Sequence, residues 1–110
     1  MDVTLLLQER GTQYGDFDRL SAIAQGIKSE MAASRNWEAL SDPLTESLEM
    51  IACKIARILN GNPYKEDSWE DIAGYAQLAL NEVRRHNAFV ASEFVAAVAN
   101  GNEVRERDAA

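Results

Sequence analysis

Two groups of acidic residues have the types and spacing best suited to chemistry. Glu46 and Glu49 lie three positions apart, and Asp67, Glu70 and Asp71 repeat this spacing further along the chain. Residues three or four apart lie on one face of a helix, so each group would present its carboxylates together. Carboxylates that converge from facing helices hold Mg²⁺ with phosphate oxygens and water, and the ion can activate water for attack on phosphorus. The sequence predicts a Mg²⁺ site formed by Glu46, Glu49, Asp67 and Asp71.

The same carboxylates also have a structural interpretation, which stays open at this point. Asp67 and Glu70 have the spacing of a capping box, in which each side chain accepts a hydrogen bond from a backbone N–H at the helix start. Acidic residues in a first helical turn are also favoured by the helix dipole. The acidic turns therefore either hold a metal ion or stabilise helix ends.

Two basic residues follow the first acidic group. Lys54 and Arg57 are one helical turn apart among small and apolar residues, so we expect their charged groups to be partly buried. A partly buried cation needs an anionic partner. The partners are Asp67 and Asp71, the phosphates of a ligand, or both.

A third candidate region lies near the beginning of the sequence. Arg10 is followed by the turn Tyr14-Gly15-Asp16-Phe17, in which glycine permits a tight backbone and Tyr14 could stack on a base. The alternative is a turn that only caps and packs a helix. Tyr75 is a second tyrosine placed to contact a base or sugar. The predicted substrate-binding residues are thus Arg10, Tyr14, Asp16, Lys54, Arg57 and Tyr75, and no catalytic residue is assigned.

The elements that carry these residues are expected to be helices. Alanine is frequent, β-branched runs are few, and apolar residues recur with the 3.6-residue period of a helix. These features predict an all-α bundle of four to five helices. The expected ranges are about 2–10, 17–34, 42–59 and 67–87, with a shorter helix at 88–99.

Capping residues set these boundaries. Gly11 should end the first helix, with a loop from Gly11 to Gly15, and Asp16 should cap the second. Asp42-Pro43 is typical of a helix start, with Asp42 as the N-cap and Pro43 at the first helical position. Asn60-Gly61-Asn62-Pro63 should stop that helix with a left-handed glycine. Asn100-Gly101 should close the last one.

Some helical positions carry predictions of their own. Gly26 lies inside the second helix and could mark a close crossing of two helices. Trp69 opens the expected core stripe of the fourth helix, whose other face contains Asp71, Tyr75 and Leu78. A second apolar face suggests a subunit interface or the wall of a ligand site, so a homodimer or higher homo-oligomer is expected.

Composition limits the classes of function. The chain has 110 residues and a net charge of −7, which predicts one domain, residues 1–101, with a polar tail at 102–110. Eight acidic residues against three basic ones lie between Glu38 and Asp71. General nucleic-acid binding would need a basic surplus and is not expected. A cation or a basic partner fits this local charge better.

Location and redox chemistry follow from what the sequence contains. Cys53 is the single cysteine, so an internal disulfide is excluded, and we expect it to fill a small buried space instead of acting as a nucleophile. The first ten residues do not have the pattern of a signal peptide. No apolar run approaches the roughly 20 residues that span a bilayer. A cytoplasmic protein without membrane contact is expected.

Three segments together resemble a known group. The residues are Arg10 with Tyr14-Gly15-Asp16-Phe17, then Met50 with Lys54-Ile55-Ala56-Arg57-Ile58, then Asp67 with Asp71-Ile72-Ala73-Gly74-Tyr75-Ala76. In this order they resemble a small domain of unknown function common in tailed bacteriophages and prophages. That domain is similar in layout to the MazG-like all-α nucleoside triphosphate pyrophosphohydrolases.

The resemblance carries its own expectations. MazG-like enzymes are helical dimers or tetramers in which two acidic turns hold Mg²⁺ and the α–β phosphate linkage is split. By resemblance, Glu46 and Glu49 correspond to the first turn, and Asp67, Glu70 and Asp71 to the second. We therefore expect a phage-encoded nucleotide-binding protein in the bacterial cytoplasm, with Mg²⁺-dependent pyrophosphohydrolysis as its reaction. The alternatives are a non-catalytic accessory protein that binds a host protein or sequesters a nucleotide signal, and a purely structural oligomer.

Overall fold

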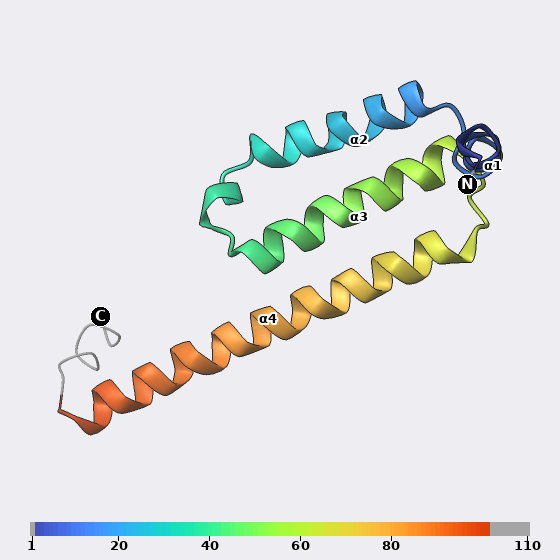
Figure 1. Ribbon diagram of the computed structural model, residues 1–110. Coiled ribbons are helices and arrows are strands. Elements are labelled where there is room, and N and C mark those ends of the chain that lie inside the picture. Colours follow the sequence, from blue (N-terminus) through green and yellow to red (C-terminus); the bar gives the residue numbers. More distant parts are fainter. Residues whose placement is uncertain (1, 102–110) are drawn as a thin grey trace. The chain divides into compact units, whose positions relative to one another are not determined.

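The computed structural model describes residues 2–101 and is helical. Its elements are α1 (Val3–Tyr14), α2 (Phe17–Ala32), the 3-10 helix η1 (Trp37–Ala39), α3 (Asp42–Asn60) and α4 (Glu66–Ala99), as Figure 1 shows. No strand occurs within the described range. The all-α class and the number of main helices are confirmed. The predicted tail, 102–110, lies outside the described residues.

The chain divides into two compact units, Met1–Ala79 and Leu80–Ala110. In the first unit α2 and α3 pack side by side, and α1 packs against both (Figure 1). The helix α4 begins in the first unit and continues into the second. The candidate residues predicted above all belong to the first unit.

The core of the first unit centres on small residues of α3. Ala52 and Ala56 lie four apart and are buried, and Ser47 is buried on the same helix. Residues four apart share one helix face, and small side chains there let a neighbouring backbone approach closely. Cys53 is half-buried, less enclosed than the predicted filler. None of the described helices combines the length and apolar character needed to cross a membrane.

The first helix is longer than predicted. It continues through Gly11 to Tyr14, and the amide of Gly15 donates a 2.9 Å hydrogen bond to the carbonyl of Gly11. The positive φ of 79° is found at Gly15, so the helix ends there and the predicted loop from Gly11 is wrong. A glycine costs an exposed helix only about 1 kcal/mol, which the neighbouring helix formers outweigh.

Helix α2 starts as predicted and ends slightly earlier. The carboxylate of Asp16 accepts a hydrogen bond from the amide of Arg19 at 3.3 Å, which is the predicted N-cap. The last residue is Ala32, two positions before the predicted end. Gly26 has open space around it, so the predicted close crossing at this residue is wrong.

Helix α3 has the predicted start, with Pro43 in the first turn, but its N-cap residue is Ser41. Its end at Asn60 agrees with the predicted stop. Gly61 has φ −133°, however, so it does not form the predicted left-handed cap. The function of this glycine is steric and is described below.

Helix α4 is one continuous helix from Glu66 to Ala99, without the predicted break after Asn87. Gly101 has φ 75° and follows the helix end as predicted. Trp69 is 55% exposed, so its assignment to the core was wrong. Its indole N–H instead donates a 2.8 Å hydrogen bond to the carbonyl of Pro63 and braces the turn before α4.

Candidate functional site

Three helix ends meet at one corner of the first unit. The side-chain amide of Asn60, at the end of α3, donates hydrogen bonds of 2.9 Å to the carbonyls of Tyr14 and Asp16. The backbone N–H of Asn62 donates a third hydrogen bond, also of 2.9 Å, to the carbonyl of Gln13. These bonds satisfy the carbonyls of Gln13 and Tyr14 at the end of α1, and the carbonyl of Asp16 accepts from Leu20 as well as from Asn60. Asn60 therefore fixes the turn 14–16 onto α3.

Two glycines allow the backbone at the end of α1 and the backbone at the end of α3 to come this close. A Cβ added at Gly15 would overlap the carbonyl oxygen of Asn60, and one added at Gly61 would overlap the backbone of Gln13 and Tyr14. Gly15 also has a positive φ that favours glycine. The corner is thus a backbone-to-backbone contact that only glycine permits at both positions.

Replacing Asn60 by alanine tests this contact. We expect a loss of about 1–2 kcal/mol in the free energy of unfolding, because the carbonyl of Tyr14 loses its donor and the carbonyl of Asp16 keeps only the amide of Leu20. Urea denaturation followed by circular dichroism measures it. Asn62→Ala is the matched control, since that side chain accepts only a local bond from the amide of Tyr64, and its cost should be about 0.5 kcal/mol. Equal losses in the two variants would contradict the assigned role of Asn60.

A pocket of about 470 Å³ opens beside this corner. It is lined by residues of α1, the turn, the start of α2 and the end of α3, namely Leu7, Arg10, Gly11, Tyr14, Gly15, Asp16, Phe17, Leu20 and Arg57. The guanidinium carbon of Arg57 lies 4.6 Å from the centre of the Tyr14 ring, a cation–π contact that orients both side chains at the pocket wall. The pocket therefore combines two arginines with aromatic and aliphatic surface.

The charges of this pocket are available to a ligand. Within residues 2–101 the ion pairs are Lys54–Asp71, Lys65–Asp67 and Arg85–Glu82, so neither Arg10 nor Arg57 is paired with a carboxylate there. Asp16 lines the pocket, but one of its oxygens accepts the capping bond from Arg19. Two guanidiniums at one pocket can recognise an anion through several parallel N–H donors.

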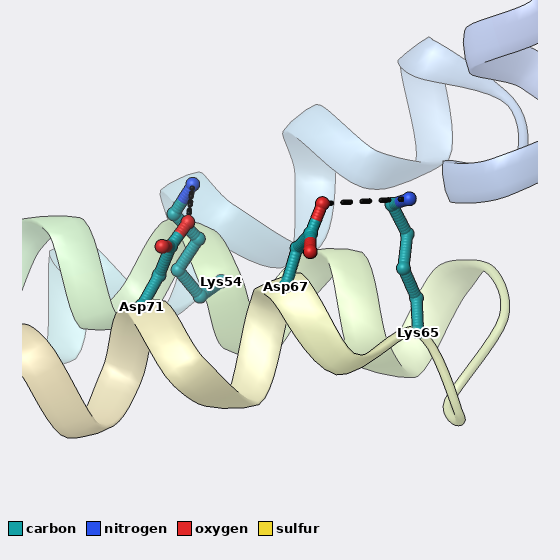
Figure 2. A network of polar contacts seen from close by, with 4 residues as sticks. All are labelled: Lys54, Lys65, Asp67 and Asp71. Carbon is teal, nitrogen blue, oxygen red and sulfur yellow. Dashed lines mark ion pairs between the residues drawn. The ribbon is translucent and has the colours of Figure 1, made fainter.

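The predicted cation Lys54 has a protein partner. Its ammonium lies 2.9 Å from a carboxylate oxygen of Asp71 (Figure 2), and the two side chains are 11% and 45% exposed. The predicted ion pair of Lys54 with Asp71 is therefore present in the structure. Asp67 points to another cation, Lys65, at 3.7 Å (Figure 2). The two aspartates thus contact separate lysines.

The four predicted Mg²⁺ ligands do not form a group suited to a metal. Within the described range no three His, Cys, Asp or Glu side chains lie together in this way. Glu46 is exposed and Glu49 half-buried on α3. These acids as placed do not fit a Mg²⁺ centre, so no chemical step is derived from one, and the metal site stays a prediction from the sequence.

Tyr75 lies apart from the pocket beside Tyr14. It lines a second, open pocket of about 490 Å³ on α4 with its neighbours Glu70, Asp71, Gly74, Gln77 and Leu78. The structure therefore brings four of the six predicted substrate-binding residues to one pocket, namely Arg10, Tyr14, Asp16 and Arg57. Lys54 and Tyr75 belong to other surroundings.

Sequence reasoning missed the residues that shape the first pocket. Asn60 and Gly61 were interpreted only as a helix stop, and Phe17 only as the last residue of the turn that begins at Tyr14. Their roles depend on contacts between residues more than 40 positions apart, such as Asn60 with Tyr14. The sequence feature that could have indicated this role is Asn60 followed by Gly61, an amide side chain and a glycine at the end of a helix.

Comparison with known proteins gives a family without a function. No curated protein and no solved structure matches the chain. A family described as a domain of unknown function, DUF6378, matches residues 3–83. This range begins with α1, ends within α4 and contains every candidate residue named above. The chain therefore belongs to the DUF6378 family.

Proposed function

We propose that this protein binds a nucleotide in the pocket beside Arg10, Tyr14 and Arg57. The observation that carries the proposal is the combination, at a pocket of about 470 Å³, of a tyrosine ring and two arginines that pair with no carboxylate among residues 2–101. Pockets for small molecules have volumes of about 300–1,000 Å³ and join apolar walls to a few polar groups. A ligand with an anionic end and a planar ring matches both halves of this lining.

Different residues of the pocket would bind different parts of the nucleotide. The guanidiniums of Arg10 and Arg57 would bind phosphate oxygens, since the planar fork of N–H donors suits them. The apolar side of the pocket, with Leu7, Phe17 and Leu20, would pack against the base, and Leu7 and Phe17 are exposed enough to do so. The contact with Tyr14 holds Arg57 in place before the ligand arrives.

Replacing Arg10 by glutamine should weaken nucleotide binding by about tenfold or more, because one charge-assisted contact to phosphate is lost. Arg10 is exposed, so we expect the fold to be unaffected. Isothermal titration calorimetry with a panel of ribo- and deoxynucleoside triphosphates gives the affinities.

The matched control is Arg19→Gln, another exposed arginine one turn beyond the pocket-lining Asp16. It removes the same charge from the protein without touching the pocket, so affinity should stay within about twofold. If none of the nucleotides binds the unmodified protein, the proposal fails. An equal loss in the two variants would mean that only net charge matters and would place the ligand elsewhere.

The reaction is a finer proposal. The resemblance to MazG-like enzymes implies Mg²⁺-dependent release of pyrophosphate from a nucleoside triphosphate, and the same titrations with and without Mg²⁺, joined to a pyrophosphate assay, test it. Binding with turnover supports the enzyme. Binding without turnover supports the alternative, a phage accessory protein that sequesters a nucleotide signal in the bacterial cytoplasm.

A further inference from the structure

The second half of α4, in the unit that begins at Leu80, exposes an apolar surface. Val90 is 51% exposed and Phe94 is 48% exposed, and Leu80 and Val83 on the same side of the helix are exposed too. The closely packed pairs among the described elements join α1, α2, α3 and η1. A single helix gains most of its stability from packing an apolar face, so this surface requires a partner.

The spacing on this segment is that of a helix that pairs with another helix. Six positions alternate in steps of three and four, the heptad pattern of a coiled coil. They are Leu80, Val83, Asn87, Val90, Phe94 and Ala97. These six positions together form what we call the seam, and Asn87 is its single polar residue. Phe89 and Val95 lie on the other side of the helix.

The seam is complementary to itself when reversed. An antiparallel pairing centred between Asn87 and Val90 sets Leu80 against Ala97 of a second copy and Val83 against Phe94, so that each large side chain meets a smaller one. Alternation of large and small side chains is what packs a helix interface without voids. A parallel pairing would instead set Phe94 against Phe94 and Ala97 against Ala97.

The charges beside the seam favour the same direction. Arg84, Arg85 and His86 lie before the centre, where Glu82 forms an ion pair with Arg85, whereas Glu93 is acidic and lies after the centre. Antiparallel pairing places His86 near Glu93 of the second copy, twice, by symmetry. Parallel pairing would bring the two basic clusters to the same level, where like charges repel.

We propose that residues 80–97 pair with the same segment of a second copy of this chain, in antiparallel orientation. The interface is isologous, so the same seam serves both copies. The same alignment sets Asn87 against Val90 of the second copy on each side of the symmetry axis, so the one polar side chain of the seam lies next to the axis in both copies. A change of register would move this amide against another apolar residue, so Asn87 favours this register.

Replacing Val90 by aspartate tests the seam. We expect the full-length protein to be a dimer in sedimentation velocity and the variant to dissociate at least about tenfold more readily. The reason is that the new carboxylate would be buried near the symmetry axis, close to the same carboxylate of the second copy, and would lose its hydration. Phe89→Asp is the matched control, with the same new charge one residue away and off the seam, and it should remain a dimer. A monomeric unmodified protein, or equal effects of the two substitutions, would overturn the proposal.

Cysteine cross-linking tests the direction without adding charge. In a Cys53→Ser background, a chain with both Leu80→Cys and Ala97→Cys should form a covalent dimer on oxidation. Chains with either substitution alone should not form one. In the antiparallel pair the two copies of residue 97, like the two copies of residue 80, are about 25 Å apart along the helix axis at 1.5 Å per residue, which is beyond the reach of a disulfide. Cross-linking of a single-cysteine chain, or none of the double-cysteine chain, would overturn the antiparallel arrangement.

Discussion

Replacing Gly61 by alanine should lower the free energy of unfolding by about 3 kcal/mol or more, because the new Cβ would overlap the backbone of Gln13 and Tyr14. A backbone neighbour cannot move aside as a flexible side chain can. Gly15→Ala should cost a similar amount, since it adds a clash with Asn60 to a positive φ. Urea denaturation followed by circular dichroism measures both losses.

Three other glycines of the chain provide matched controls. Gly11, Gly26 and Gly74 lie inside helices and have open space around the position of a Cβ. Alanine there should raise the free energy of unfolding by about 0.5–1 kcal/mol, because alanine loses less backbone entropy in a helix. The double variant of Gly15 and Gly61 should cost less than the sum of the single ones, since both disrupt one contact. A Gly61→Ala protein as stable as these controls would contradict the described corner.

The glycines also show which part of the fold could be predicted from the sequence. Helix starts at Asp16 and Pro43 were predicted because caps act within one turn, so neighbouring residues contain the information. The end of α1 was wrong because Gly11 and Gly15 are both plausible stops. What decides between them is the docking of Gly15 on Asn60, a contact with a residue 45 positions away.

The candidate site was predictable to the same limited extent. Arg10, Tyr14 and Arg57 were selected from their types, and they do lie at one pocket. Grouping them needed the packing of α1 on α3, which no local pattern encodes. Residue type alone left an ion pair, a ligand phosphate or both as partners of Lys54, and the ion pair follows only from its position opposite Asp71.

Breaking the ion pair between Lys54 and Asp71 should cause the second large loss of stability. Asp71→Asn should cost about 2–3 kcal/mol in the free energy of unfolding, because it leaves the largely buried ammonium of Lys54 without its anion. Lys54→Met should cost less, about 1 kcal/mol, since methionine keeps the apolar stem and the half-exposed carboxylate of Asp71 can be hydrated. The double variant should then be more stable than Asp71→Asn alone.

Asp67→Asn is the control for this pair. Its carboxylate is 74% exposed and lies 3.7 Å from Lys65, so its loss should cost no more than about 0.5 kcal/mol. Thermal unfolding with and without Mg²⁺ in the same proteins separates the two roles considered for Asp71. A structural partner of Lys54 predicts the stability order above at any Mg²⁺ concentration. A metal ligand predicts instead that Asp71→Asn abolishes stabilisation by Mg²⁺ while it leaves the metal-free stability almost unchanged, and that result would contradict the ion-pair role.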